Sequence, residues 1–419
     1  MRKRCARLGL IAPLLLPMLP ALAANQTDSY PAALPPPALV HDVLARQPRV
    51  AAARAGISAE QANSRRLAAG TYEWSVRTTV QRRNEASGPR YHENEIAVER
   101  PLRWMSKADK DVELGDHGVR VSEARLGDAW HEAARGLLKD WFDWLREARA
   151  ALRLAQHAQL LEQQLSIVRR RVRAGDAPRM DAMLAETERD RAQAAYLQAE
   201  QRRELLAAGL RSRYPGLEPR MPEALPAPQP LAGDEEAWRR KILEDNHEIE
   251  LAQAEARIDR LGAERAALDR LPDPTLGLRY AQERDRQERI FGVSVSIPIP
   301  GTARREQELA SLSRADMAQE RAREVRVRVE GDALQVSMRA AAAQALSAQL
   351  AGISGQAENN AALVARAYAL GEAPLNDTLL ARRQALDALT AAEQARIDAL
   401  EAQARLLLDM HAIWSLHAE

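Results

Sequence analysis

Four short segments of the chain carry an apolar residue at every second position. This alternation predicts β-strands with one apolar and one polar face. The segments pair into two predicted hairpins, residues 72–104 and 274–300, whose turns at 82–90 and 283–289 are strongly charged, as solvent-facing loops should be. The alternating positions are Trp74, Val76, Thr78, Val80, Ile96, Val98, Leu276, Leu278, Tyr280, Phe291, Val293, Val295, Ile297 and Ile299.

Apolar positions around the hairpins follow a helical period instead. A predicted helix precedes each hairpin, at residues 37–69 and 235–271. A much longer predicted helix follows each hairpin, at residues 106–174 and 302–370, and Ser106 is the predicted N-cap of the first. At 1.5 Å per residue, each long helix would form a rod of about 100 Å.

The second rod carries an apolar stripe with coiled-coil spacing. The stripe advances 35 residues in ten steps, a mean spacing of 3.5 residues. We therefore expect this face of the rod to pack against another helix. The positions are Ala318, Ala322, Val325, Val329, Ala333, Val336, Ala340, Ala343, Leu346, Leu350 and Ile353.

Both rods end in a sequence that predicts a helical hairpin. Gly175 and Gly371 suit the C-terminal cap of a helix, and Pro178 and Pro374 suit the first turn of the next one. The helix before each hairpin and the returning helix together match one rod in length, so they could stack end to end beside it. The returning helices are predicted at residues 179–213 and 375–415.

The elements recur in the same order because the chain contains a duplication. Residues 173–185 and 369–381 share Gly, Ala, Pro, Asp, Leu and Ala at an offset of 196. Two further landmarks match at offsets of 199 and 197, namely 47–50 with 246–249 and 99–102 with 296–299. We therefore divide the chain into a first repeat at 25–213, a Pro-rich linker at 214–234 and a second repeat at 235–419.

The first 24 residues have the features of a secretory signal peptide. A basic head precedes an apolar run at residues 8–22, and small residues follow at the expected cleavage site. The run is shorter than the roughly 20 residues of a membrane anchor, which is the alternative. Cys5, the single cysteine, precedes this run, so we expect an exported, non-lipidated protein whose mature chain has no thiol.

Composition excludes several classes of function. The 60 Lys and Arg residues nearly balance the 59 Asp and Glu residues, which argues against a nucleic-acid partner. Only 4% of residues are aromatic, which suits long helices packed through small side chains. Since no later segment has 18 consecutive apolar residues, a membrane role would fall to the strands.

Strands of about ten residues can cross a bilayer when they are tilted. An open sheet cannot do so, because each unpaired edge amide costs several kcal/mol in lipid. Four strands would therefore need partners from other chains, and three chains would supply twelve. The alternative is a soluble sheet that covers a core. Aromatic residues near the strand ends fit membrane-interface girdles, although soluble sheets have them too: Tyr72, Trp74, Tyr91, Trp104, Tyr280 and Phe291.

This duplicated order of helix, hairpin, rod, glycine turn and helix resembles the TolC family of outer-membrane efflux channels. The resemblance covers essentially the whole mature chain, and residues 289–300 further resemble the CzcC-like heavy-metal branch, which exports cobalt, zinc and cadmium. It implies an α+β membrane protein. This would be a homotrimer whose twelve-stranded β-barrel in the outer-membrane lipid is continuous with a long periplasmic coiled-coil α-helical barrel.

The resemblance also implies partners and sites. Substrate would arrive from an inner-membrane pump of the resistance–nodulation–division (RND) class through a periplasmic membrane-fusion adaptor. The adaptor would dock on the rod tips, at Gly175, Ala177, Pro178, Gly371, Ala373 and Pro374. Asp377 and Asp181 would line the periplasmic entrance as a cation-selective ring; the alternative is that each stabilises the N-terminus of its helix. Some relatives carry a second acidic residue where this chain has Leu184 and Leu380.

No other chemistry is predicted. Motifs for nucleophilic, nucleotide or metalloprotease chemistry are absent, so we expect neither an enzyme nor a cofactor. The eight histidines lack metal-ligand spacing, and Met180 and Met183 suit packing better than soft-metal binding, so we predict no metal site.

Two questions stay open at this level. Trp130, Trp141, Phe142 and Trp144 form either an equatorial belt against the linker or an ordinary helix–helix core. The alternative functions are a channel for drug efflux or type I secretion and, in a different class, a periplasmic coiled-coil adaptor or structural protein.

Overall fold

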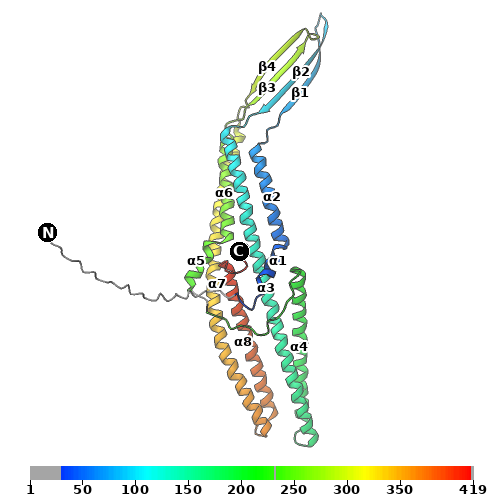
Figure 1. Ribbon diagram of the computed structural model, residues 1–419, viewed down its shortest axis with the longest axis vertical. Helices are drawn as coiled ribbons and strands as arrows, with labels where there is room; N and C mark the ends of the chain where they lie inside the picture. The colour runs from blue at the N-terminus through cyan, green and yellow to red at the C-terminus, as the bar shows by residue number, and fades with distance from the viewer. Residues whose placement is uncertain (1–29, 231–232, 417–419) are drawn as a thin grey trace, which may run out of the picture.

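The computed structural model describes residues 30–230 and 233–416. The predicted signal peptide and Cys5 lie outside these residues. The molecule is elongated, with a four-stranded sheet at one end and helical hairpins at the other (Figure 1). Among the described helices, none is both long and apolar enough to cross a lipid bilayer.

The predicted duplication appears as two sets of helices. The two rods are α3 and α7, and each is followed by a returning helix of 35 residues. The first set is α1 (Pro37–Ala45), α2 (Pro48–Ala69), α3 (Met105–Ala174) and α4 (Arg179–Arg213). The second set is α5 (Glu235–Glu244), α6 (His247–Leu268), α7 (Thr302–Leu370) and α8 (Leu375–Asp409).

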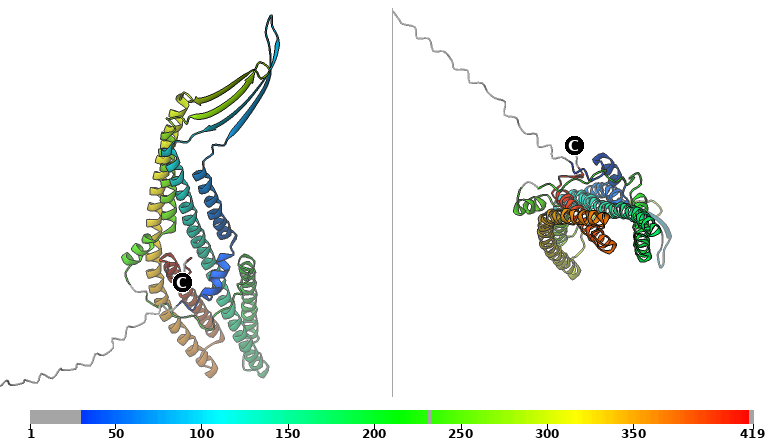
Figure 2. Two further views of the ribbon diagram at one scale, coloured as in Figure 1. Left: turned by 45° about the horizontal axis from the view of Figure 1, so that its top comes forward. Right: turned by 90° about the horizontal axis from the view of Figure 1, so that it is seen from below.

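The helices lie side by side in an open layer. Near the sheet, the contacts run in the order α7–α6–α3–α2; near the tips, the order is α7–α8–α3–α4. The early and returning helices therefore stack end to end beside the rods, as predicted. Viewed along the rods, the layer forms an arc (Figure 2). Its two edges are α7 on one side and the α2–α4 stack on the other.

Both glycine turns have the predicted cap geometry. Gly175 and Gly371 adopt left-handed φ values of 84° and 81°, which suit a residue without a Cβ. In each turn the glycine N–H and the next N–H bond back to carbonyls of the last helical turn, which is the Schellman arrangement. Pro178 and Pro374 occupy the N-cap positions rather than the first helical turn.

Some predicted helix boundaries differ from the structure. The predicted helices 37–69 and 235–271 are both interrupted: Gln47 precedes a new helix at Pro48, and the side chain of Asn246 caps α6 by accepting from the amides of Glu248 and Ile249. Pro48 disfavours a helical conformation at Gln47, and the Asn246 cap begins a new helix, so both breaks occur within a continuous apolar pattern. Helix α3 begins at Met105, with Trp104 rather than Ser106 as N-cap, and α8 ends at Asp409.

The stripe predicted on α7 is only partly correct. Towards the tip, the buried seam consists of small residues spaced by seven, whereas the larger Leu346 and Ile353 are about half exposed. Small side chains allow α7 and α8 to approach closely, so the seam falls one position along from the large residues. The seam residues are Ala333, Ala340, Ser347, Ser354 and Ala361.

The two hairpins merge into one antiparallel sheet in the order β1-β2-β3-β4. Strands β2 and β3, from different repeats, pair over Asn94↔Gln282 to Pro101↔Thr275. The strands are β1 (Ser75–Asn84), β2 (Arg90–Pro101), β3 (Thr275–Glu283) and β4 (Glu288–Ser296). Both edges, β1 and β4, are left without a neighbouring strand within the described chain.

The main hydrophobic core lies at the middle of the molecule. The aromatic group on α3, formed by Trp130, Trp141, Phe142 and Trp144, packs there with the linker residues Tyr214, Leu217 and Leu225. The indole N–H of Trp141 also donates to the carbonyl of Ala33 over 2.8 Å. Both alternatives therefore apply, because the aromatic group packs on the linker and also on helix residues such as Leu210 of α4 and Leu400 of α8.

Candidate functional site

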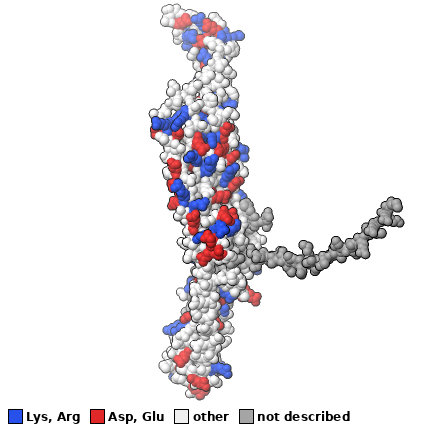
Figure 3. Space-filling model, turned by 90° about the vertical axis from the view of Figure 1, so that its left-hand side faces the viewer, with Lys and Arg blue, Asp and Glu red and all other residues white. Residues whose placement is uncertain are grey.

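The sheet has two faces of opposite character. One face is apolar and open to the surroundings, with Val80, Val293 and Phe291 exposed by 74%, 73% and 80%. In the strand register these positions share a face with Ile96, Leu276 and Leu278. Figure 3 shows charge at the hairpin turns and along the rods, with a largely uncharged band between. Such a face requires an apolar surrounding.

The opposite face is polar and internally paired. Arg83 contacts both Glu93 of β2 and Glu283 of β3 at 3.1 Å, and Arg279 lies 3.4 Å from Glu95. These ion pairs join strands of both repeats. The sheet therefore presents apolar side chains on one side and hydrogen-bonding side chains on the other, the pattern of a transmembrane strand beside water.

The predicted interface aromatics lie at the helix end of the strands, further out along them and near the turns. At the helix end, Trp104 donates its indole N–H to the carbonyl of Pro272 over 2.9 Å, and Arg100 lies over the ring of Trp74. Tyr72 precedes β1 at the same end. Further out, Tyr280 and Phe291 pair with ring centroids 4.8 Å apart. Near the turns, Tyr91 faces the Arg284 guanidinium.

A buried lysine holds the junction between the sheet and the rods. Lys107, in the first turn of α3, is 1% exposed, and its ammonium lies 3.0 Å from both Asp269 and Asp273. Asp273 also accepts from the hydroxyl of Tyr72. The junction thereby joins the segment before β1, the start of α3 and the segment before β3. We call Lys107, Asp269, Asp273 and Tyr72 the neck cluster.

Both neck carboxylates are held in their charged form. Burial raises the pKa of Asp269, but hydrogen bonds from Arg265 and Lys107 outweigh it and lower the pKa below its usual value. Burial likewise opposes a lowered pKa at Asp273, where Tyr72 and Lys107 supply the hydrogen bonds. Burial, together with Asp273, raises the pKa of Tyr72 to about 12. These pKa shifts keep both carboxylates charged and the Tyr72 hydroxyl protonated at neutral pH, so the cluster is stable there.

The two rod tips share one small core. Tyr368 of α7 and Leu375 and Leu379 of α8 join Leu165 and Val168 of α3 in a hydrophobic cluster. The guanidinium of Arg171 lies 5.0 Å from the ring centroid of Tyr368. The structure therefore brings the Gly175 and Gly371 turns to the same end of the molecule.

The predicted tip residues lie around this core. Gly175, Pro178, Gly371 and Pro374 are exposed, while Ala177 and Ala373 are half-buried. Asp377 is exposed and Asp181 is half-buried, and both occupy the first turn of their helices.

The two tip methionines do not pack within this chain. Met180 and Met183 are 65% and 68% exposed, so the predicted packing role is not found here. The reason is that α4 buries its alanines, such as Ala185 and Ala192, and turns the methionines outward.

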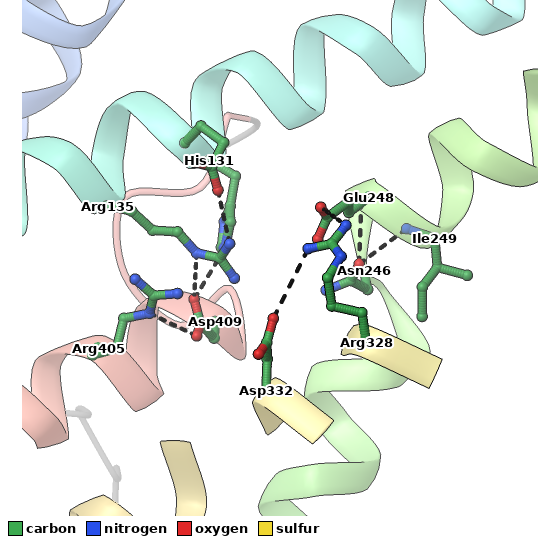
Figure 4. A network of polar contacts seen from close by, with 10 residues as sticks. His131, Arg135, Asn246, Glu248, Ile249, Arg328, Asp332, Arg405 and Asp409 are labelled. Atoms are coloured by element: carbon green, nitrogen blue, oxygen red, sulfur yellow. Dashed lines mark hydrogen bonds and ion pairs between the residues drawn. The ribbon is translucent and has the colours of Figure 1, made fainter. Parts of the chain in front are cut away.

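A polar network occupies the middle of the molecule (Figure 4). Asp409, at the end of α8, is buried and accepts from His131, Arg135 and Arg405 at 3.1, 3.0 and 2.8 Å. Burial opposes ionisation, but these partners lower the pKa of Asp409 to about 2. Across the gap in the figure, Arg328 pairs with Glu248 and Asp332.

The neck cluster and this network were not predicted from the sequence. Their members are far apart in the chain, and charged residues are common along solvated helices, so no local spacing distinguishes them. The one available signal was position, because Lys107 and Asp273 immediately flank the predicted hairpins. Within the described residues, no group of three or more His, Cys, Asp or Glu side chains could hold a metal ion.

Solved structures to which this chain is similar in fold include outer-membrane proteins. The chain matches VceC of Vibrio cholerae with a TM-score of 0.73 and 15% identity, over 89% of this chain and 95% of that one. It matches the CmeC channel of Campylobacter jejuni at 0.69 and 12%, over 91% and 86%. It matches the open MtrE channel of Neisseria gonorrhoeae at 0.62 and 19%, over 89% and 88%. No protein-family profile and no curated protein sequence matches the chain.

The neck cluster leads to a stability prediction. Replacing Lys107 with Met should lower the free energy of unfolding by about 2 kcal/mol, because Asp273 loses its buried cation. This is less than for a fully buried pair, since Asp269 is 47% exposed. Thermal unfolding of the purified protein at neutral pH measures the effect. The difference should shrink as the pH falls from about 4, the ordinary pKa of an aspartate in the unfolded chain, through the lowered pKa values of the two folded carboxylates.

Lys110 provides the matched control. It lies one turn away on α3 and pairs with Glu113 and Glu264 at a more exposed position. Lys110→Met should cost well under about 1 kcal/mol. Equal effects of the two substitutions would contradict the role assigned to Lys107.

Proposed function

We propose that this chain is one subunit of a homotrimeric outer-membrane efflux channel of the TolC type. In this proposal the sheet contributes four of twelve strands to a barrel in the outer membrane, and the helical layer contributes one third of a periplasmic tunnel. The observation that carries the proposal is the sheet itself, which exposes a wide apolar face yet leaves both edge strands unpaired.

The physical reason is the cost of a strand edge in lipid. The apolar face of the sheet needs lipid or an apolar partner, but the free amides and carbonyls of β1 and β4 cannot enter lipid unpaired. Pairing β4 of one copy with β1 of the next satisfies both requirements at once. The paired charges on the other face then line a water-filled interior.

The helical layer supports the same closure. Its edges are α7 and the α2–α4 stack, on opposite sides, just as β4 and β1 are the opposite edges of the sheet. Leu346, Ile353 and Leu363 on α7 are exposed in the single chain. A neighbouring subunit would cover part of this surface, so one rotation closes both layers. Rods of about 100 Å would then reach deep into the periplasm.

The tips would form the periplasmic entrance and the docking site for a membrane-fusion adaptor. The exposed turns around Gly175 and Gly371 present backbone and small side chains to such a partner, and an inner-membrane pump of the RND class would deliver the cargo. Asp377, exposed in the first turn of α8, would be repeated three times around the axis. Such a carboxylate ring attracts cations. Asp181 is the corresponding residue of the first repeat.

A different class of function is a periplasmic adaptor or structural protein. Such proteins have long helical hairpins, but they have no need for a sheet with a wide exposed apolar face. Among channels, the cargo is the open choice. The resemblance of residues 289–300 to the CzcC-like heavy-metal branch favours divalent metal cations as the cargo. Drug efflux and type I secretion are the alternatives.

Membrane insertion tests the proposal directly. Val293→Arg places a charge on the apolar face of β4 and should cost about 2–4 kcal/mol near the membrane centre. The assembled, heat-modifiable form in the outer-membrane fraction should therefore decrease. Ser294→Arg, on the polar face one residue away, should assemble normally. Recovery of the wild-type protein entirely in the soluble periplasm would refute the channel.

The entrance ring has its own test. Asp377→Asn should reduce cation-over-anion selectivity and weaken block by divalent cations in planar bilayers, because the substitution removes three negative charges from the ring. Asp181→Asn, at the half-buried position of the other tip, should have a smaller effect. Unchanged selectivity and block in Asp377→Asn would exclude the ring while leaving the channel intact.

The cargo is tested in cells. A deletion strain should become more sensitive to zinc, cobalt and cadmium, and plasmid expression of the chain should restore tolerance. Sensitivity to dyes and detergents is the comparison. Loss of dye tolerance with unchanged metal tolerance would assign the channel to drug efflux instead.

A further inference from the structure

Three histidines from distant parts of the sequence meet at the junction of α8 and α6. His131 lies on α3, His247 is the first residue of α6, and His411 follows the end of α8. The ring centroids of His131 and His411 are 5.1 Å apart, those of His247 and His411 are 4.8 Å apart, and those of His131 and His247 are 6.3 Å apart. We call these three residues the histidine cluster.

The backbone at His411 repeats the geometry of the two rod tips. Its N–H bonds to the carbonyl of Leu408 and the next N–H, of Ala412, bonds to Leu407, which is again the Schellman pattern. At the tips the left-handed position is glycine, whereas here it is His411, with φ of 59°. A side chain with a Cβ is disfavoured in this conformation. The fold thus holds an imidazole at a strained position.

The ring of His411 is left without hydrogen bonds within the described chain. Both its nitrogens are buried and lack a partner, while His131 donates to Asp409 over 3.1 Å and His247 lies 3.4 Å from Glu250. Neutral imidazoles can pack in this way, but three protonated ones would repel one another. The close packing of the three rings therefore requires neutral imidazoles.

The segment that follows His411 holds the central core together. Ile413 and Trp414 are buried among the aromatic residues of α3. The carbonyl of Trp414 accepts from the indole of Trp130 over 2.7 Å, and its own indole donates to Tyr30 over 2.7 Å. Release of residues 410–416 would therefore open the core and free the junction between α8 and α6.

Three of the surrounding carboxylates are already paired with cations. Asp409 contacts Arg135 and Arg405, Glu248 contacts Arg328, and Asp245 contacts Lys241. These three have little uncompensated charge left to stabilise protonated imidazoles, and the exposed Glu250 contacts His247 alone among the three imidazoles. The groups around the cluster are His41 of α1, Arg49 of α2, Asp128, Glu132 and Arg135 of α3, Lys241 of α5, Asp245 after it, Glu248 and Glu250 of α6, Arg328 and Asp332 of α7, and Arg405 and Asp409 of α8.

The titration of the cluster agrees with this geometry. Burial, with His131 and His247 adding to it, lowers the pKa of His411 to about 4. Burial also lowers the pKa of His131, and the hydrogen bond with Asp409 opposes it. The pKa of His411 is lowered only while residues 410–416 are packed against α3. This packing is therefore fully stable above the ordinary histidine pKa near 6.5, and its stability is lost as the pH falls towards 4.

We propose that the histidine cluster is an acid-sensitive lock, in which protonation of the imidazoles releases residues 410–416 from α3 and loosens the junction between α8 and α6. The corresponding junction of the first repeat is built differently. There Gln47 donates to the carbonyl of Arg213 over 2.9 Å, and Tyr214 donates to Asp140 over 3.0 Å. The lock thus belongs to one repeat, and it does not depend on the channel function.

Hydrogen exchange of the full chain, purified in detergent, tests the lock. Peptides covering residues 407–416 are compared at about pH 7.5 and about pH 5.5, with exchange corrected for its intrinsic pH dependence. Protection in the wild-type protein should fall about tenfold at the lower pH, the ratio for a group whose pKa rises from about 4 to 6.5 on release. Unchanged protection would overturn the proposal.

Substitutions identify the titrating group. His411→Asn removes the imidazole without hydrogen bonds and tolerates the left-handed backbone, so its protection should fall clearly less than that of the wild type. His247→Gln, which keeps His411, should show a smaller fall than the wild type and covers the case in which His411→Asn does not fold. His157→Asn, at a half-buried imidazole elsewhere on α3, should respond like the wild type.

Two results would refute the lock. An equal fall in His411→Asn and the wild type would assign the pH response to other groups. Protection that requires added zinc and disappears with a chelator would make the cluster a metal site instead. Loss of membrane insertion by the wild-type chain would refute the proposed channel, yet it would leave this measurement valid.

Discussion

The structure depends on the fact that its layers do not close within one chain. The sheet ends at β1 and β4, and the helical layer ends at the α2–α4 stack and α7. A compact protein would fold these edges onto a core, but rods of 70 and 69 residues are too long and stiff to do so. Their remaining surface is left for lipid and for neighbouring subunits in the proposed assembly.

Within this open layer, small residues and buried ion pairs replace a large core. Alanine and serine at spacings of seven let α7 approach α8 closely, while aromatic residues concentrate at the middle, where the linker and the chain end add thickness. At the junction of rods and sheet, Lys107 joins both repeats through two carboxylates. The two ion pairs of Lys107 lie where the helical layer meets the sheet, so they fix the orientation of the sheet on the rods.

The two repeats share a fold but differ in chemistry at matching positions. Their tips have the same backbone geometry, yet one aspartate is exposed and the other half-buried. Their helix junctions also differ, because the first uses an amide and a tyrosine hydroxyl and the second uses three imidazoles. A closed ring of such subunits would have alternating, inequivalent walls. This inequivalence would allow acid to loosen the helix junction of the second repeat while that of the first stays unchanged.

The sequence alone determined the local elements and their order. The duplication, the period-two strands, the rods and the glycine turns follow from short-range sterics and from apolar periodicity, so Gly175 and Gly371 could be placed as caps without coordinates. Fold similarity to outer-membrane channels agrees with that order. The helix breaks at Gln47 and Asn246 were not predicted, because Pro48 at the first and the Asn246 cap at the second interrupt the helix without interrupting the apolar pattern.

Only the tertiary structure decided which distant residues meet. The pairing of β2 with β3, the burial of Lys107 between two aspartates and the meeting of His131, His247 and His411 all join segments more than a hundred residues apart. A charged or titratable side chain has the same local sequence signature whether it faces water or a buried partner. Its chemistry is set by burial and by its neighbours, and both depend on long-range packing.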